Sequence, residues 1–186
     1  MSTSLLRQRG HQDSSRVSMV ELFFDLVFVF AVTQLSHALL ADLSVKGAMQ
    51  TLLLFLALWW LWIFTSWVTN WLDPERPPVR VMLFALMLAG LLLSSSIPQA
   101  FGERGLVFGV VFAAMQVGRT VFVACVMRGH SPVHFHTFVR IASWMSLSAV
   151  FWFLGGLAAG PSGASFWIAA VAIEYISPAV YFWVPG

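Results

Sequence analysis

The stretch VELFFDLVFVFAVTQLSHALL, residues 20–40, decides what kind of fold this chain adopts. It is an almost unbroken apolar run, and about 20 such residues are enough for an α-helix to cross the hydrocarbon core of a bilayer. It nevertheless carries two carboxylates near its start, Glu21 and Asp25. The run is too long and too acidic for a cleaved signal peptide. We therefore expect a permanent membrane-spanning helix that keeps two acidic groups.

The composition of the whole chain also indicates a membrane protein. Of the 186 residues, 59% are hydrophobic and only 10% are charged, whereas a soluble domain has about 25% charged residues. The net charge of +2 is too small and too scattered to indicate nucleic-acid binding. Cys125 is the single cysteine, so no disulfide forms within the chain. The expected partner of this chain is therefore the lipid bilayer, and we expect no binding of nucleic acid.

Five further apolar runs follow the first, and Pro- and Gly-containing segments such as DPERPP and GPSG separate them. The six predicted spans cover residues 20–40, 48–72, 79–98, 105–127, 138–159 and 164–184. The predicted fold is an all-α polytopic membrane bundle of about six transmembrane helices over residues 20–186. A polar tail, residues 1–19, precedes it.

The distribution of Lys and Arg predicts the orientation, because cytoplasmic loops carry an excess of both. One side of the predicted membrane would have seven of these residues: Arg7, Arg9, Arg16, Arg76, Arg80, Arg128 and Arg140. The other side would have two, Lys46 and Arg104. This asymmetry places both termini, and with them the tail, in the cytoplasm.

Four ionisable residues fall within the predicted spans: Glu21, Asp25, Arg119 and Glu174. Each would cost about 2.5–3.5 kcal/mol near the centre of a spanning helix, so such residues usually mark functional sites. At about 1.5 Å of rise per residue, Asp25 lies about 7 Å, Arg119 about 12 Å and Glu174 about 15 Å from the cytoplasmic side. Long side chains at these depths could meet if the first, fourth and sixth helices were neighbours.

The balance of these charges predicts a site for a proton or a cation. Three acids face one arginine, which can neutralise only one carboxylate. Glu21 and Asp25 also repel each other when both are ionised, which favours a proton on one of them. Two alternatives remain open: Glu21 lies at the interface beside a helix N-terminus, and Glu174 forms a structural ion pair with Arg119.

Other polar and aromatic residues give weaker signals. Thr33 and His37 could extend a proton relay along the first helix, although His37 is more typical of a histidine near the membrane surface. Three histidines of the loop RGHSPVHFH lack a nearby thiol or carboxylate, so we expect no metal site and no cofactor. The tryptophans at positions 59, 60 and 62 are expected to pack or to face lipid. Small-residue ridges (Gly105, Gly109 and Ala113; Ala114 and Gly118) allow close helix packing and predict a homo-oligomer.

Enzymatic functions find little support. GPSG, residues 160–163, resembles the nucleophile motif of rhomboid proteases, but no histidine follows His136 to act as the base. The metalloprotease motif H-E-x-x-H and the phosphate-binding loop are absent from the sequence. We therefore expect that the protein is not an enzyme.

Several motifs together resemble a known family. VELFFDLVFVFAVTQLSH (20–37), WWLWIFTSWVTNWLDPE (59–75), QVGRT (116–120) and WIAAVAIEYISP (167–178) are similar, in the same order, to motifs of the bacterial low temperature requirement protein A (LtrA) family. The resemblance implies a multi-pass protein of the bacterial inner membrane and supplies no catalytic residues. Family members are usually about twice as long, so this chain, which stops at FWVPG, would be a truncated half-protein or a short form.

Two hypotheses follow. In the first, the protein is a transporter-like or channel-like bundle with Glu21, Asp25 and Glu174 as a proton or cation site and Arg119 as the fixed counter-charge. In the second, it is a non-transporting membrane scaffold or assembly partner in which the same residues form a static, structural ion pair. Substitutions that abolish flux would favour the first, and substitutions that only damage stability would favour the second.

Overall fold

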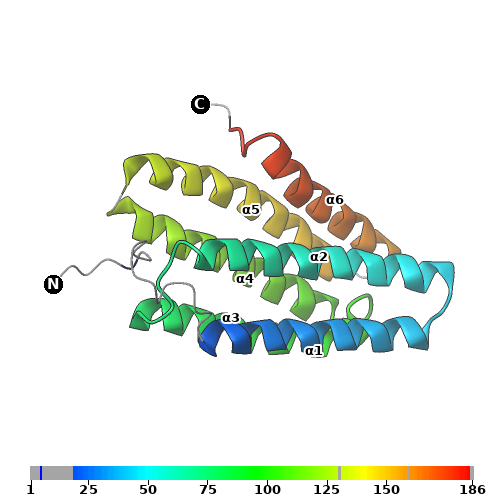
Figure 1. Cartoon of the computed structure of the whole chain (residues 1–186). Coiled ribbons are helices and arrows are strands. Elements are labelled where there is room, and N and C mark those ends of the chain that lie inside the picture. Colours follow the sequence, from blue (N-terminus) through cyan, green and yellow to red (C-terminus); the bar gives the residue numbers. More distant parts are fainter. Residues whose placement is uncertain (1–4, 6–18, 130, 159, 185–186) are drawn as a thin grey trace.

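The computed structural model of the chain describes residues 5, 19–129, 131–158 and 160–184, and these form an all-helical bundle (Figure 1). Its helices are α1 (Met19–Ala41), α2 (Val45–Thr69), α3 (Pro77–Ser96), the short 3-10 helix η2 (Ile97–Gln99), α4 (Gly105–Arg128), α5 (Pro132–Ala158) and α6 (Gly160–Ala179). The predicted all-α fold is confirmed.

Five of these helices, α1 to α5, are long and apolar enough to cross a membrane. The fifth of these spans begins at Pro132, six residues before the predicted start. Helix α6 has 20 residues but is less apolar, because it begins with small and polar residues and carries Glu174 in its second half. The orientation of the bundle and the role of the tail stay predictions.

The helices pack in a closed ring. Helix α1 packs on α3, α3 on α4, α4 on α5 and α5 on α6, while α2 closes the ring between α6 and α1. A smaller contact joins α2 to α4 across the ring. Figure 1 shows α1 to α5 running roughly side by side, with α6 inclined to them. Among the described helices, α1 has no comparable packing with α4 or α6, so the first, fourth and sixth helices do not form one cluster.

Helices α4 and α5 approach each other closely because both carry glycine where they cross. A Cβ on Gly109 would lie 2.3 Å from the carbonyl oxygen of Trp152, and one on Gly156 would lie 2.8 Å from that of Gly105. The first small-residue ridge therefore packs against α5 within the chain. The second ridge makes no such contact at Gly118, which is exposed and has no atom within 4 Å of its hypothetical Cβ among the described residues. Arg119, the residue after Gly118, faces the buried side of α4 instead.

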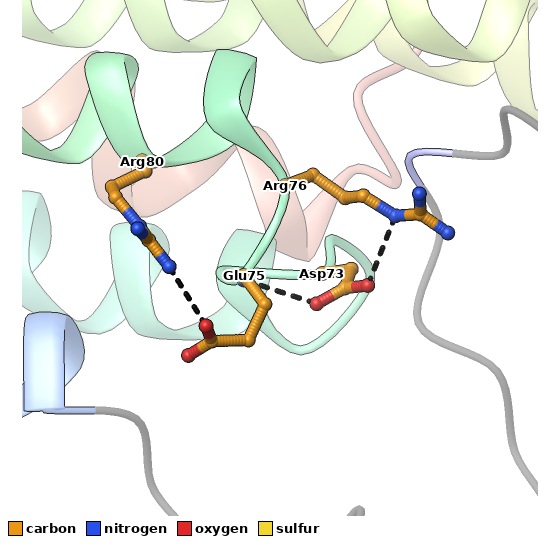
Figure 2. A network of polar contacts seen from close by, with 4 residues as sticks. All are labelled: Asp73, Glu75, Arg76 and Arg80. Atoms are coloured by element: carbon orange, nitrogen blue, oxygen red, sulfur yellow. Dashed lines mark hydrogen bonds and ion pairs between the residues drawn. The ribbon is translucent and has the colours of Figure 1, made fainter.

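The turn between α2 and α3 is a polar end of the bundle (Figure 2). Arg76 Nε lies 3.3 Å from an Asp73 carboxylate oxygen, and Arg80 Nη2 lies 2.7 Å from a Glu75 carboxylate oxygen. Pro77 begins α3, where a missing backbone N–H costs nothing. Such exposed ion pairs contribute only about 0–1 kcal/mol to the free energy of unfolding.

Candidate functional site

The carboxylate of Glu174 lies in the interior of the bundle, where α4, α5 and α6 meet. Its side chain is 0% exposed. Oxygen Oε1 accepts three hydrogen bonds, from Gln116 Nε2 at 2.7 Å, from Trp152 Nε1 at 2.7 Å and from the Ser148 hydroxyl. Ser148 and Trp152 are four residues apart on α5, so one face of that helix presents both donors. Three neutral donors from two other helices therefore solvate one oxygen of this carboxylate.

Arg119 is also buried, 1% exposed, but its contacts lie on α2. Nitrogen Nη1 donates to the carbonyl oxygen of Leu61 at 3.0 Å and to the hydroxyl of Thr65. The guanidinium carbon lies 4.6 Å from the centre of the Phe64 ring, a cation–π arrangement. Arg119 thus ties α4 to α2 without using a carboxylate.

Arg119 and Glu174 do not form an ion pair, which corrects the predicted pairing of this arginine with an acid. Within the described residues, no salt bridge involves either group. The physical reason is the order of the helices: Arg119 extends towards α2, whereas Glu174 is held by α4 and α5. The arginine is still close enough to attract the carboxylate electrostatically.

The two charged groups leave hydrogen-bonding capacity unused in a buried region. Glu174 Oε2 and Gln116 Oε1 are acceptors without a partner in the described part of the protein, and Arg119 Nε and Nη2 are donors without one. An unsatisfied buried polar group costs about 1–3 kcal/mol. Gln116 and Arg119 are three residues apart on α4, so these groups share one face of the helix. The cluster therefore combines two acceptor atoms and two donor atoms that no other described group satisfies.

Asp25 lies elsewhere, between α1 and α2. It is half-buried, and its Oδ1 accepts a hydrogen bond from Trp62 Nε1 at 2.8 Å. Trp62 follows Leu61, whose carbonyl accepts from Arg119, so consecutive residues of α2 contact Asp25 and Arg119. Trp62 packs against the core, as expected, and in addition donates this hydrogen bond, which the sequence did not predict.

The remaining predicted site residues lie on α1. Glu21 is half-buried in its first turn, where a helix N-terminus favours a negative charge. Thr33 is exposed, donates to the carbonyl of Val29 and lines the same groove as Asp25. His37 is exposed and lines a different groove, which also contains Asp42. The structure thus divides the predicted candidates into a closed interior site and an α1 group.

The sequence analysis missed the neutral residues that hold the charged ones: Gln116, Ser148, Trp152 and Thr65. A signal for one of them existed, because Gln116 precedes Arg119 by three residues and polar groups one turn apart share a helix face. Ser148 and Thr65 gave no such signal, since hydroxyl residues are common in membrane helices.

The histidines provide no metal site in the described part of the chain. No group of three His, Cys, Asp or Glu residues there is arranged to hold a metal ion. His134 Nδ1 lies 2.8 Å from the Ser131 hydroxyl, and His130 is outside the described residues.

A ring of long apolar helices enclosing two fully buried ionisable groups defines a multi-pass α-helical membrane protein. Residues 16–186 match the family described as bacterial low temperature requirement A protein (LtrA). The chain belongs to this family. It is 44% identical, over 178 residues, to an uncharacterized protein of Rhizobium meliloti (strain 1021). That match covers 96% of this chain but 44% of the relative, so the chain spans less than half of that protein's length. No solved structure matches it.

Proposed function

We propose that this chain is part of a bacterial cytoplasmic-membrane protein that carries a proton or a small cation through its interior, with Glu174 as the binding group. The observation that carries the proposal is the buried Glu174 carboxylate, which has three neutral donors on one oxygen and no partner on the other within the described chain. A carboxylate bound by neutral donors can gain or lose a proton without breaking an ion pair. The proposal gives the chain no catalytic role.

Arg119 acts in this proposal as a fixed positive charge. Its contacts with α2 hold it in place whether or not Glu174 is protonated, because none of them involves the acid. The guanidinium stays protonated at all physiological pH values. It would therefore favour the ionised form of Glu174 and prevent a bound cation from remaining there permanently.

The proposal is tested by proton flux into proteoliposomes that contain the purified chain and an internal pH-sensitive dye. After a pH step, the parent should equilibrate faster than protein-free liposomes, and Glu174→Gln should remove the difference. Gln keeps an oxygen that accepts the hydrogen bonds but cannot ionise. Glu75→Gln is the matched control, because it removes an exposed carboxylate at the end of the bundle. A parent no faster than protein-free liposomes would refute the proposal for this chain.

The second candidate is a static scaffold, and a specific observation favours it as well. The bonds of Arg119 and Glu174 together connect four helices, α2, α4, α5 and α6, which is what a structural lock requires. The match covers 44% of its relative, which also fits a part that assembles with further segments. In this alternative, Glu174→Gln lowers the unfolding temperature while the parent shows no flux. The same set of proteoliposome and stability measurements therefore separates the two.

A further inference from the structure

A groove of about 500 Å³ runs between α1 and α2, away from the Glu174 site. Asp25 and the aromatic side chains of Phe28, Phe55, Trp59 and Trp62 line it. Aliphatic and small hydroxyl side chains of the same two helices complete the lining, which includes no Lys, Arg or His. The described walls of this groove thus carry one negative charge in an otherwise apolar and aromatic surface.

The carboxylate of Asp25 is held at a fixed level in this groove. It lies six residues after the start of α1, or about 9 Å along the helix. Its only hydrogen bond within the described residues uses Oδ1, which accepts from Trp62. No positive side chain pairs with it in this part of the structure. A carboxylate at membrane depth is costly unless a positive charge or water compensates it.

The aromatic rings stand next to this carboxylate on one face of α2. Phe55, Trp59 and Trp62 are spaced by four and three residues, with ring centroids 6.2 Å and 5.4 Å apart. The side chains of Phe55 and Trp59 are 39% and 46% exposed, so ligands can reach the rings. The electron-rich faces of such rings attract organic cations, and tryptophan does so most strongly.

We propose that this α1–α2 groove binds a monovalent lipophilic organic cation, such as a quaternary phosphonium or ammonium ion with aromatic substituents. Its volume suits a drug-sized molecule, its aromatic and aliphatic walls suit an apolar body, and Asp25 supplies the charge that selects a cation. A hydrated metal ion would gain little from these walls, and an anion would be repelled. Val29 and Val32 on the groove are 60% and 45% exposed, so such a molecule can enter sideways from the bilayer.

This binding site is independent of the function proposed for Glu174. Asp25 is on α1 and Glu174 on α6, the two carboxylates share no hydrogen-bond donor, and binding at Asp25 requires no proton movement at Glu174. Glu174→Gln should therefore abolish proton flux but leave cation binding intact, whereas Asp25→Asn should weaken cation binding. The failure of one proposal is thus distinguishable from the failure of the other.

The test is equilibrium binding of radiolabelled tetraphenylphosphonium to the full chain in lipid nanodiscs. The parent should show saturable binding above that of protein-free nanodiscs, and Asp25→Asn should lower the affinity about tenfold or more, the effect of about 1.4 kcal/mol. Asparagine keeps an oxygen acceptor for Trp62, so the helix contact survives. Asp42→Asn, the same change in a different groove, should bind like the parent. Neutral triphenylphosphine oxide should not compete.

Two further variants keep the test decisive if Asp25→Asn folds poorly. Trp59→Leu, at a half-exposed ring, should lower the affinity about threefold to tenfold by removing a cation–π partner. Val29→Cys in a Cys125→Ser background should react with a membrane-permeant thiol reagent more slowly when tetraphenylphosphonium is bound. Equal affinity in the parent, Asp25→Asn and Trp59→Leu would overturn the proposal. So would quantitative disulfide cross-linking of Val29→Cys between two copies, because the groove would then be an interface between chains.

Discussion

The two acidic sites of this bundle belong to different helices, Glu174 to α6 and Asp25 to α1, and differ in how they accommodate a carboxylate at membrane depth. Glu174 is completely enclosed and accepts hydrogen bonds from three side chains of α4 and α5. Asp25 is half-buried, accepts one from Trp62 and borders an open groove. The number of donors thus follows the degree of enclosure: the enclosed carboxylate has three side-chain donors, whereas the half-buried one has a single donor and lies beside an accessible groove.

The largest expected effect comes from removing the positive charge of the closed site. Arg119→Met should destabilise the chain by about 3–5 kcal/mol, because α4 loses two hydrogen bonds from a charged donor to α2, each worth about 1.5–3 kcal/mol. Arg80→Met removes an arginine from an exposed ion pair and should cost about 0–1 kcal/mol. Unfolding in mixed micelles with increasing SDS measures both. Equal losses for the two variants would mean that Arg119 is not needed in the interior.

The donors of the closed site provide a finer test. Ser148→Ala removes one of the three hydrogen bonds to Glu174 and should cost about 1.5–3 kcal/mol, the range for a bond to a charged group. Ser143→Ala is the matched control on the same helix, because among the described residues that exposed hydroxyl only donates to the carbonyl of Val139. The same SDS titration should show a change of less than about 0.5 kcal/mol for the control. A negligible loss for Ser148→Ala would argue that Glu174 does not depend on this donor.

The α4–α5 contact positions the donors of the closed site, so it should be intolerant of larger residues. Gly109→Ala places a methyl group against the Trp152 carbonyl and should cost about 1–3 kcal/mol by overpacking. Gly118→Ala, on the same helix but with open space around it, should be neutral or slightly stabilising. Thermal unfolding of the two variants, followed by circular dichroism, compares them directly. A tolerant Gly109 would contradict the close crossing of α4 and α5.

The open site should be the least sensitive to loss of its hydrogen bond. Trp62→Phe keeps the ring but removes the N–H that donates to Asp25, with an expected cost of about 1 kcal/mol. Trp59→Phe is its control, since the Trp59 indole donates no hydrogen bond to any other described residue, and it should cost less. Stability is again measured by SDS unfolding. A loss for Trp62→Phe as large as that for Ser148→Ala would remove the distinction between the two sites.

The sequence was sufficient to predict the class of fold and the buried charges, but not their partners. Long apolar runs separated by Pro and Gly predict helices of the observed kind, since each helix satisfies its own backbone in lipid. Arg119 and Glu174 stood out because charges are rare at such depth. The partners depend on which helices are neighbours, and hydropathy contains no information on this. The ring order places α2 against Arg119 and α5 against Glu174, so the predicted pairing of the arginine with an acid was wrong.

The same limitation explains Trp62 and the small-residue ridges. A tryptophan in an apolar helix is usually part of the packing, and its bond to Asp25 follows only from the antiparallel pairing of α1 with α2. Gly109 and Gly118 look alike in the sequence, yet one contacts α5 and the other is exposed. Which of the two glycines faces a neighbouring helix depends on how α4 is rotated about its own axis. Packing sets this rotation, and the sequence pattern does not reveal it.

The most direct test of the central claim is the protonation of Glu174 itself. Infrared difference spectra of the chain in nanodiscs, recorded between alkaline and acidic buffer, should contain a carboxylic-acid C=O band that is absent from Glu174→Gln and unchanged in Asp25→Asn. That result would show that the enclosed carboxylate exchanges a proton. Identical spectra for the parent and Glu174→Gln would contradict the account, because the carboxylate would then be locked in one state.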